Sequence, residues 1–364
     1  MKDKVGILTW HYYFNFGSSL QAFALQKFIE GLGYDVRIVN YRNPLLDKRI
    51  WWKDAARVVL CHTIGLFSLR VRNKYSIPNA ERFQKRYLRQ TKRFENPECL
   101  PLHIKGYRSL VYGADQIWAP NVYKPIYMGA YVPDGVCKVS YAASVGLNHI
   151  PDELADTYAS NLSSFHAIAV REEEGRDLLK SRCNVDAQVV LDPTLMIEVQ
   201  VYRNMERPLD VPIAGEYLFC YFLNKTHQYR ERVKDYAKRH GLQIVGCSDK
   251  ESDAEWMHRL ENVGADQFLW LVDNATAVFT DSYHGSIFSL LFHKDFWTLV
   301  RFAENSPICQ NSRIRQLQNY FGIGHRIISD TSEMDESKAI DYELFERQLT
   351  ELRLHSLTYL RNAL

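Results

Sequence analysis

The chain has 364 residues, enough for two ordinary domains with a large buried core. Hydrophobic residues make up 46% and charged residues 24%, which is typical of a globular protein, and the net charge of +2 gives no overall field that favours nucleic acid as a partner. No apolar run approaches the roughly 18 to 20 residues that span a bilayer, which excludes an ordinary transmembrane helix.

Seven cysteines are scattered along the chain without a CxxC pair or the spacing of a metal site, so we expect a reducing compartment and no metal. Only Met1 to Lys4 precede the first apolar run, which is too short for a signal peptide and indicates a strand. These features predict a cytoplasmic protein.

The segment 48–93 is strongly basic, with thirteen Lys or Arg residues against two acids, and it carries Trp51 and Trp52. A solvated helical face is the commoner origin of such a run. Contact with an anionic lipid-linked substrate or with the inner face of the membrane is the alternative, and it would make the protein peripheral to that membrane.

Short apolar runs alternate with amphipathic stretches, the pattern of parallel sheets flanked by helices. In chain order we expect strands at 5–10, 36–40, 109–112, 137–143, 167–171 and 187–191, with a helix at 18–32 that ends at a glycine. A second series of strands is expected at 217–223, 242–246, 277–280, 296–300 and 326–328.

Between the two series, the stretch 192–215 holds three prolines and lacks clean periodicity, so we place the domain linker there. The prediction is an N-terminal Rossmann-like domain at 1–200, a second at 210–330 and a helical tail at 331–364. The helix at 342–360 has an apolar stripe that Ser356 interrupts, and this stripe must pack back on one or both domains. The expected fold is therefore α/β, with two Rossmann-like domains facing across a cleft.

The most informative stretch is Thr280-Asp281-Ser282-Tyr283-His284-Gly285, which joins an apolar strand to an apolar helix expected at 286–292. Unpaired backbone N–H groups at such a junction favour an anion, and a histidine beside them could deliver a proton. The alternative is structural: Asp281 or Ser282 caps the helix, and His284 is a packed turn residue.

A second candidate follows the first strand, where Asn15-Phe16-Gly17-Ser18-Ser19 supplies a glycine and two hydroxyls at a helix start. A phosphate or carboxylate would gain there from N–H groups and the helix dipole. The stretch is neither G-x-G-x-x-G nor a P-loop, which disfavours an NAD enzyme or an ordinary kinase. A tight turn that lets the helix pack on the sheet is the alternative.

Three other stretches supply polar groups. Asp115 follows a strand and is placed as a general base or a helix cap. Arg171 ends a strand and could hold a carboxylate, unless the acids 172–174 neutralise it. Arg313 and Arg315 are two further anion clamps, or ordinary surface arginines.

Six motifs in this order resemble the polysaccharide pyruvyl transferase family over about residues 4–325: NFGSSLQA from Asn15, GADQIW from Gly113, YAAS from Tyr141, VRE from Val170, LDPTL from Leu191 and TDSYHG from Thr280. The resemblance implies a GT-B-like fold, no cofactor and no required metal. It also implies transfer of a pyruvyl group from phosphoenolpyruvate onto two hydroxyls of a sugar, giving a cyclic ketal and phosphate.

By the same resemblance, the family's histidine falls on His284, its donor-binding arginine on Arg171 and its strand-end aspartate on Asp115. One departure concerns the donor. Better-understood members carry an arginine two residues before the histidine, where this chain has Ser282. Either another arginine (Arg301, Arg313 or Arg315) replaces that charge, or the donor differs.

The predicted site has three groups of residues. His284 and Asp115 are the predicted catalytic residues. Donor binding is assigned to Arg171, Gly17, Ser18, Ser282, Gly285, Arg313 and Arg315, and acceptor binding to Asn15, Gln116, Trp118 and Ser144. The expected acceptor is a sugar that is nucleotide-linked, lipid-linked or polymeric. Two rivals share the architecture: a GT-B-type glycosyltransferase that uses a nucleotide sugar, and a carbohydrate-binding relative without catalysis.

Overall fold

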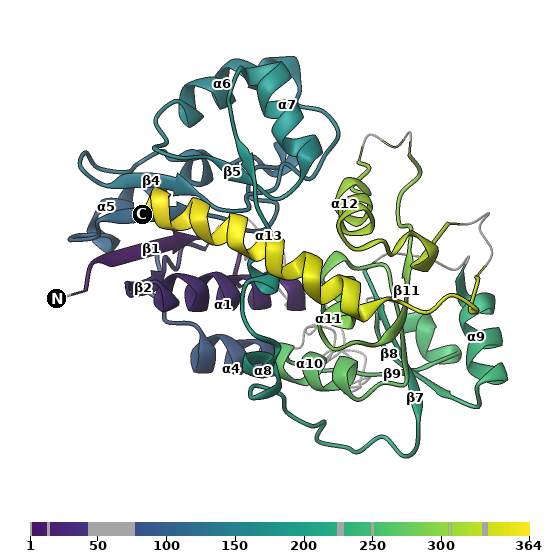
Figure 1. The fold of residues 1–364 in the computed structure, drawn as a ribbon. Helices are drawn as coiled ribbons and strands as arrows, with labels where there is room; N and C mark the ends of the chain where they lie inside the picture. Colours follow the sequence, from purple (N-terminus) through teal and green to yellow (C-terminus); the bar gives the residue numbers. More distant parts are fainter. Residues whose placement is uncertain are drawn as a thin grey trace, which may run out of the picture.

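The structure is a computed structural model that describes residues 2–12, 15–42, 77–223, 229–248, 251–304, 306, 308–329 and 334–364. Two parallel sheets, each with its own helices, lie side by side, and a long C-terminal helix crosses both (Figure 1). We call the part that carries β1 to β6 the N-terminal unit and the part that carries β7 to β12 the C-terminal unit.

The N-terminal sheet is parallel throughout and has the order β2-β1-β3-β4. Its strands are β1 (Lys4–Leu8), β2 (Asp35–Ile38), β3 (Ser109–Tyr112) and β4 (Cys137–Ser140). Beyond β4, the pair β5 (Ala169–Val170) and β6 (Gln188–Val189) is joined on by isolated parallel bridges. Strand β3 is buried along its whole length, as expected for a strand covered on both faces.

The C-terminal sheet is also parallel, and its strands are β7 (Tyr217–Phe222), β8 (Gln243–Ser248), β9 (His258–Arg259), β10 (Ala277–Thr280), β11 (Asp295–Leu299) and β12 (Ile327–Ile328). Across the sheet they run β9-β8-β7-β10-β11-β12. This is the Rossmann order 3-2-1-4-5-6, whose direction of winding reverses between β7 and β10. Sheets of this kind bind ligands outside the carboxyl ends of the strands at that reversal.

The helices cover the sheets and connect their strands. In chain order they are α1 (Phe16–Gly31), α4 (Ile77–Tyr87), α5 (Leu100–His103), α6 (Asp152–Leu162), α7 (Glu173–Cys183), α8 (Val199–Arg203), α9 (Arg230–Arg239), α10 (Ala265–Asp273), α11 (Tyr283–Leu291), α12 (Ser312–Phe321) and α13 (Tyr342–Ala363). The short 3-10 helices are η1 (Pro97–Cys99), η2 (Pro120–Val122), η3 (Pro125–Met128), η4 (Pro193–Leu195), η6 (Glu251–Glu255) and η7 (Gly324–Arg326).

Helix α1 lies between the two units. Most of its side chains are buried, and it contacts η4 of the N-terminal unit and both α10 and α11 of the C-terminal unit. At its start, Phe16 stacks on Phe268 of α10 with the ring centroids 4.8 Å apart. One hydrophobic cluster therefore runs from the first sheet into the second.

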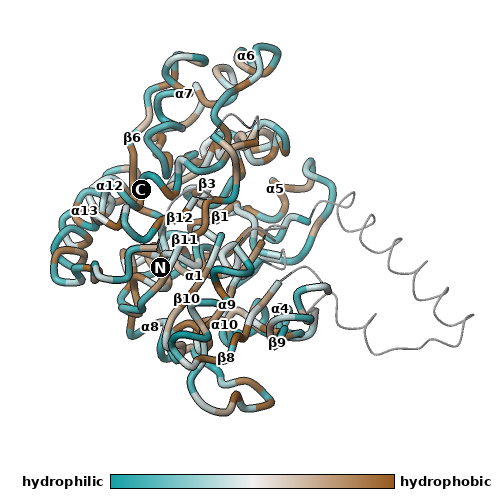
Figure 2. The backbone as a smooth tube through the Cα atoms, turned by 90° about the vertical axis from the view of Figure 1, so that its right-hand side faces the viewer, coloured by the Kyte–Doolittle hydropathy of each residue, from teal (hydrophilic) through white to brown (hydrophobic). Residues whose placement is uncertain are grey.

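Helix α13 crosses both units and alternates between hydrophilic and hydrophobic stretches (Figures 1 and 2). Its first turns pack on the C-terminal unit, where the rings of Phe345 and Phe321 lie 4.8 Å apart. Its last turns pack on the N-terminal unit, where the hydroxyl of Tyr359 donates to the carbonyl of Ser140 at 2.8 Å. The tail thus packs back on both units.

The two series of strands confirm the predicted α/β fold with two Rossmann-like parts. The main differences are local. The helix expected at 286–292 begins at Tyr283, because Ser282 is its N-cap. The stretch taken for a linker contains η4 and α8, and the two-residue strand β9 was not predicted. Of the basic segment 48–93, residues 48–76 lie outside the described residues. In the part of the chain that is described, no helix is long and apolar enough to cross a membrane.

Candidate active site

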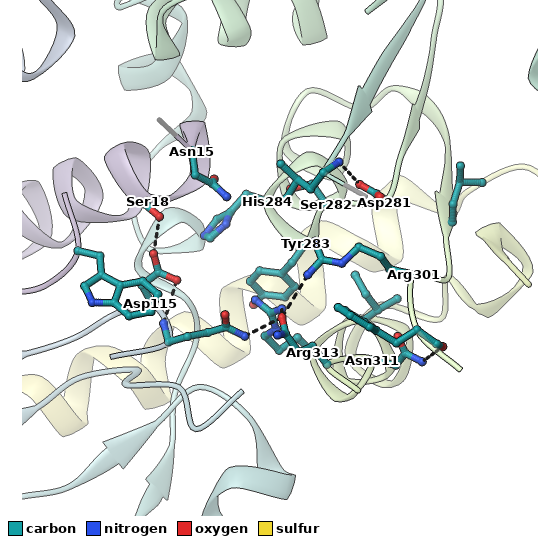
Figure 3. Close-up of a pocket in the computed structure, with 17 residues that line it drawn as sticks. Asn15, Ser18, Asp115, Asp281, Ser282, Tyr283, His284, Arg301, Asn311 and Arg313 are labelled. Carbon is teal, nitrogen blue, oxygen red and sulfur yellow. Dashed lines mark hydrogen bonds between the residues drawn. The ribbon is translucent and has the colours of Figure 1, made fainter. Parts of the chain in front are cut away.

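A cavity of about 120 Å³ lies where the two units meet (Figure 3). The N-terminal unit contributes Trp10, Asn15, Ser18, Asp115 and Gln116, which follow β1 and β3. The C-terminal unit contributes Leu223, Asp281, Ser282, Tyr283 and His284, which follow β7 and β10, and also Leu299, Arg301, Phe302, Gln310, Asn311, Arg313 and Ile314. The strands β1 and β3 mark the winding reversal of their sheet just as β7 and β10 do, so both ligand-binding positions open into one cavity.

Asp115 forms a fixed carboxylate in the wall from the N-terminal unit. Its Oδ2 accepts a hydrogen bond from the Ser18 hydroxyl at 2.5 Å, and its Oδ1 accepts one from the backbone N–H of Gln116 at 2.8 Å. The residue has a φ of 61°, a left-handed conformation that aspartate tolerates better than most residues. Two hydrogen bonds leave further lone pairs on this carboxylate, so it can still accept a proton from a ligand in the cavity.

The starts of α1 and α11 are both capped by side chains. The Oδ1 of Asn15 accepts from the N–H of Gly17 at 2.8 Å, and the Oγ of Ser282 accepts from the N–H of Gly285 at 3.3 Å. Each cap therefore occupies one N–H group of those that we expect to hold a phosphate, and binding of a phosphate by the remaining N–H groups stays a prediction. Asn15 and Ser282 themselves line the cavity, whereas Gly285 packs against Thr280.

His284 lies in the first turn of α11 and lines the cavity (Figure 3). Its Nε2 lies 3.4 Å from Oδ2 of Asp192, a residue of the N-terminal unit that directly precedes η4. Asp192 is buried, which alone would raise its pKa, but His284, Arg171 and a hydrogen bond from Thr194 together hold the pKa of its carboxyl well below its usual value. His284 therefore has an ionised partner behind it.

Arg171 lies behind the cavity rather than in its wall. Its Nη1 donates to Oδ2 of Asp192 at 2.8 Å, and its guanidinium lies over the ring of Tyr283, 4.8 Å from the centroid. Tyr283 itself lines the cavity. Asp192 and the ring of Tyr283 hold this guanidinium, but its Nε and Nη2 make no hydrogen bond among the described residues, so the assignment of Arg171 as a donor ligand stays a prediction.

Two other arginines supply positive charge at the cavity. The Nη2 atoms of Arg313 and Arg301 donate to Oε1 of Gln310 at 2.7 Å and 3.2 Å. Burial, followed by repulsion from Arg171 and Arg301, lowers the pKa of Arg313 to about 10. A low pKa caused by burial and neighbouring cations marks a position where an anion would be stabilising.

The family model for polysaccharide pyruvyl transferases matches residues 15–301, which include both capped helix starts, Asp115, Asp192 and His284. The chain belongs to the polysaccharide pyruvyl transferase family. None of the curated proteins matches it in sequence.

Several solved structures share the fold of this pyruvyl transferase family member. A candidate UDP-N-acetylglucosamine 2-epimerase from Listeria monocytogenes superposes with a TM-score of 0.53 at 10% identity, covering 99% of this chain and 90% of its own. AviGT4, a glycosyltransferase involved in avilamycin A biosynthesis, gives 0.52 at 11% identity and covers 99% and 96%. MnaA from S. aureus, solved with UDP, gives 0.51 at 9% identity and covers 99% and 91%. At such identities the likeness concerns the fold alone, and it confirms the GT-B-like architecture.

Seven of the predicted site residues meet at the cavity of this family member: Asn15, Ser18, Asp115, Gln116, Ser282, His284 and Arg313. Gly17 is packed against the ring of His284. At position 282, where the resemblance implies an arginine, this chain has a serine that caps α11. The arginines at the cavity are Arg301, which follows β11, and Arg313, which lies in α12.

Besides Arg171, Gly17 and Gly285, three further predicted residues do not line the cavity. Arg315 pairs with Glu304 at 2.6 Å and with Glu174 at 3.5 Å, because two residues along a helix turn it about 200° from Arg313. Trp118 is fully buried and donates its indole N–H to a backbone carbonyl. Ser144 is also fully buried, and its hydroxyl donates to Glu172 at 2.6 Å. Asp192, in contrast, is a site residue to which we had assigned no role, although it stands in one of the six motifs.

Proposed function

We propose that the protein transfers a pyruvyl group from phosphoenolpyruvate onto two hydroxyls of a sugar, in the biosynthesis of a cell-surface polysaccharide or glycan. The products are a cyclic ketal and inorganic phosphate. The observation that carries this proposal is the asymmetry of the cavity (Figure 3). The wall from the C-terminal unit holds two partly buried cations, Arg301 and Arg313, against one carboxylate, Asp281, while the opposite wall holds the carboxylate of Asp115 and no cation among the described residues. His284 lines the same cavity.

The cationic wall suits the donor. Phosphoenolpyruvate carries a carboxylate and a phosphate, and guanidinium groups bind both by charge-assisted, bidentate hydrogen bonds. Arg301 and Arg313 therefore replace the charge that Ser282 lacks. In this arrangement the donor lies against the C-terminal unit, and its anionic groups displace or join the side chain of Gln310 that both arginines now contact.

The opposite wall suits a sugar acceptor. Asn15, Ser18 and Asp115 offer neutral and acidic hydrogen-bonding groups to hydroxyls, and the indole of Trp10 offers an apolar face to a sugar ring. The described residues of this wall include no arginine or lysine, so the wall does not compete with the other side for the donor's charges.

The chemistry follows from this placement. His284 gives a proton to the methylene carbon of phosphoenolpyruvate, and the adjacent carbon becomes cationic. A sugar hydroxyl attacks that carbon while Asp115 accepts its proton, which returns to His284 through solvent. The bond from carbon to the phosphate oxygen then breaks. The second hydroxyl attacks the same carbon, closes the ring and loses its proton to the departing phosphate, so one donor and one diol give one ketal and one hydrogen phosphate.

The test measures phosphate released from phosphoenolpyruvate with a panel of nucleotide-linked and simple hexosides, and identifies the ketal by mass spectrometry. We expect release that depends on both the acceptor and His284, so His284→Ala abolishes turnover while the melting temperature stays within a few degrees. Binding of a UDP-sugar without phosphate release would overturn the proposal in favour of a glycosyltransferase. Binding of simple sugars alone would overturn it in favour of a non-catalytic relative.

A further inference from the structure

We propose that Asp192 is a positioning residue that holds the ring of His284 through Nε2, so that Nδ1 is the atom that exchanges protons with the substrate. The inference deepens the proposed function: its kinetic consequence rests on that function, whereas the orientation of the ring does not.

The two nitrogens of His284 have different surroundings. Nε2 is buried, lies 3.4 Å from Oδ2 of Asp192 as a charge pair and makes no hydrogen bond among the described residues. Nδ1 lies on the side of Gly17, and the residue as a whole lines the cavity. A proton on Nε2 would lie beside this carboxylate, which leaves Nδ1 as the nitrogen that faces a ligand.

The carboxylate of Asp192 is itself held in place. Its Oδ1 accepts hydrogen bonds from the backbone N–H of Thr194 at 2.9 Å and from the Thr194 hydroxyl at 2.6 Å, and Arg171 donates to Oδ2 at 2.8 Å. Asp192 is 1% exposed and does not line the cavity. It cannot reach a substrate, so its effect on the chemistry passes through His284.

The pair joins the two units. Asp192 belongs to the N-terminal unit and precedes η4, which packs against both α1 and α11, while His284 belongs to the first turn of α11. The histidine has its oriented ring only when the units are docked as they are here. Proton transfer and the packing of the two units are thus coupled through one contact.

The first test is side-chain ¹⁵N NMR of the full chain labelled on histidine, in alkaline solution where histidine rings are neutral, with His284 assigned by its loss in His284→Gln. In the wild type we expect Nε2 protonated and Nδ1 unprotonated. In Asp192→Asn the amide can turn its N–H₂ toward Nε2, so the proton should move to Nδ1, the wrong tautomer. The same tautomer in both proteins, or a protonated Nδ1 in the wild type, would overturn the inference.

The second test is kinetic. We expect Asp192→Asn to lower kcat by about 10²-fold or more while the KM for phosphoenolpyruvate changes less than about threefold, because Asp192 lies outside the cavity. Asp266→Asn is the matched control, because Asp266 is 1% exposed and pairs with Arg82 and Arg207. This substitution also removes a buried, paired carboxylate, but away from the site, and should leave kcat unchanged.

If Asp192→Asn does not fold, Thr194→Val keeps the inference testable. It removes one hydrogen bond from Oδ1 and should lower kcat by about tenfold with little change in KM. An active wild type whose kcat is unaffected by either substitution contradicts the inference. If the expected tautomers are observed but the wild type releases no phosphate, the proposed function is contradicted and the positioning role of Asp192 is retained.

Discussion

A Cβ atom on Gly17 would overlap the imidazole ring of His284 at Nδ1. Gly17 belongs to the first turn of α1 in the N-terminal unit, and His284 belongs to the first turn of α11 in the C-terminal unit. The two helix starts approach so closely that only a residue without a side chain fits between them. This contact and the one between His284 and Asp192 lie on the two sides of the same ring.

We therefore expect Gly17→Ala to lower kcat by about 10²-fold, because a misplaced catalytic group loses rate steeply with distance. Steady-state kinetics and thermal unfolding measure the effect. Gly31→Ala is the control at the other end of the same helix, where a new Cβ would meet nothing within 4 Å. It should keep full activity and gain a few tenths of a kcal/mol or more in stability. Equal activity of Gly17→Ala and wild type would exclude the close packing of this ring.

Arg313→Gln should separate ligand binding from stability. Losing a charge-assisted contact costs about 1.5 to 3 kcal/mol, so the KM for phosphoenolpyruvate should rise about ten- to a hundredfold. Because the pKa of Arg313 is lowered to about 10, its positive charge destabilises the folded state at every pH below that value. The ligand-free variant should therefore unfold at the same or a higher temperature. Arg315→Gln, two positions along α12 but paired with Glu304 and Glu174, should change neither quantity.

Much of this fold follows from local sequence. Alternating apolar runs and amphipathic stretches predicted the strands of both sheets within a few residues, and the junctions after the strands predicted that His284, Asp115 and Ser18 would meet. The helix boundary at Ser282 was harder, because a serine before an apolar run either caps a helix or joins a loop. That boundary decides whether the N–H of Gly285 is open to a ligand or already bonded.

The remaining differences have a common physical cause. Whether Arg313 or Arg315 faces the cavity depends on the rotation of α12 about its axis, which no local pattern around two polar residues fixes. Asp192 and His284 are distant in the chain and belong to different units, so their contact depends on how the units dock. Arg171 was placed correctly at a strand end, but the ring of Tyr283 that covers it comes from the other unit.

Ser356 interrupts the apolar stripe of α13 for a structural reason. Its hydroxyl is buried, accepts a hydrogen bond from the backbone N–H of Leu191 at 2.9 Å and donates to the carbonyl of Leu352. Ser356→Ala leaves that N–H without a partner and should lower the free energy of unfolding by about 1 to 3 kcal/mol in denaturant titrations. Thr358→Ala, which removes an exposed hydroxyl bonded within the helix, should shift it by less than about 0.5 kcal/mol. A similar effect of the two substitutions would show that the bond to Leu191 contributes nothing.

His11 should make the protein sensitive to mild acid. Burial lowers the pKa of its ring to about 4, against hydrogen-bonding contacts with Thr9 and Asn40 that act in the opposite direction. Above about pH 6.5 the ring is neutral in both states and contributes nothing to the pH dependence. Between about pH 6.5 and 4 the ring takes up a proton in the unfolded chain but stays neutral in the folded chain. The free energy of unfolding therefore decreases as the pH is lowered, by about 3 kcal/mol in all.

Urea titrations at a series of pH values measure this loss as the difference between the wild type and His11→Gln, in which the corresponding part of the slope should vanish. The control is His149→Gln, which removes an exposed histidine. It should keep the slope of the wild type, because an exposed ring is solvated in both states. If His11→Gln kept that slope as well, the proton uptake would have to be assigned to another group, and the neutral, buried state of the His11 ring in the folded protein would be wrong.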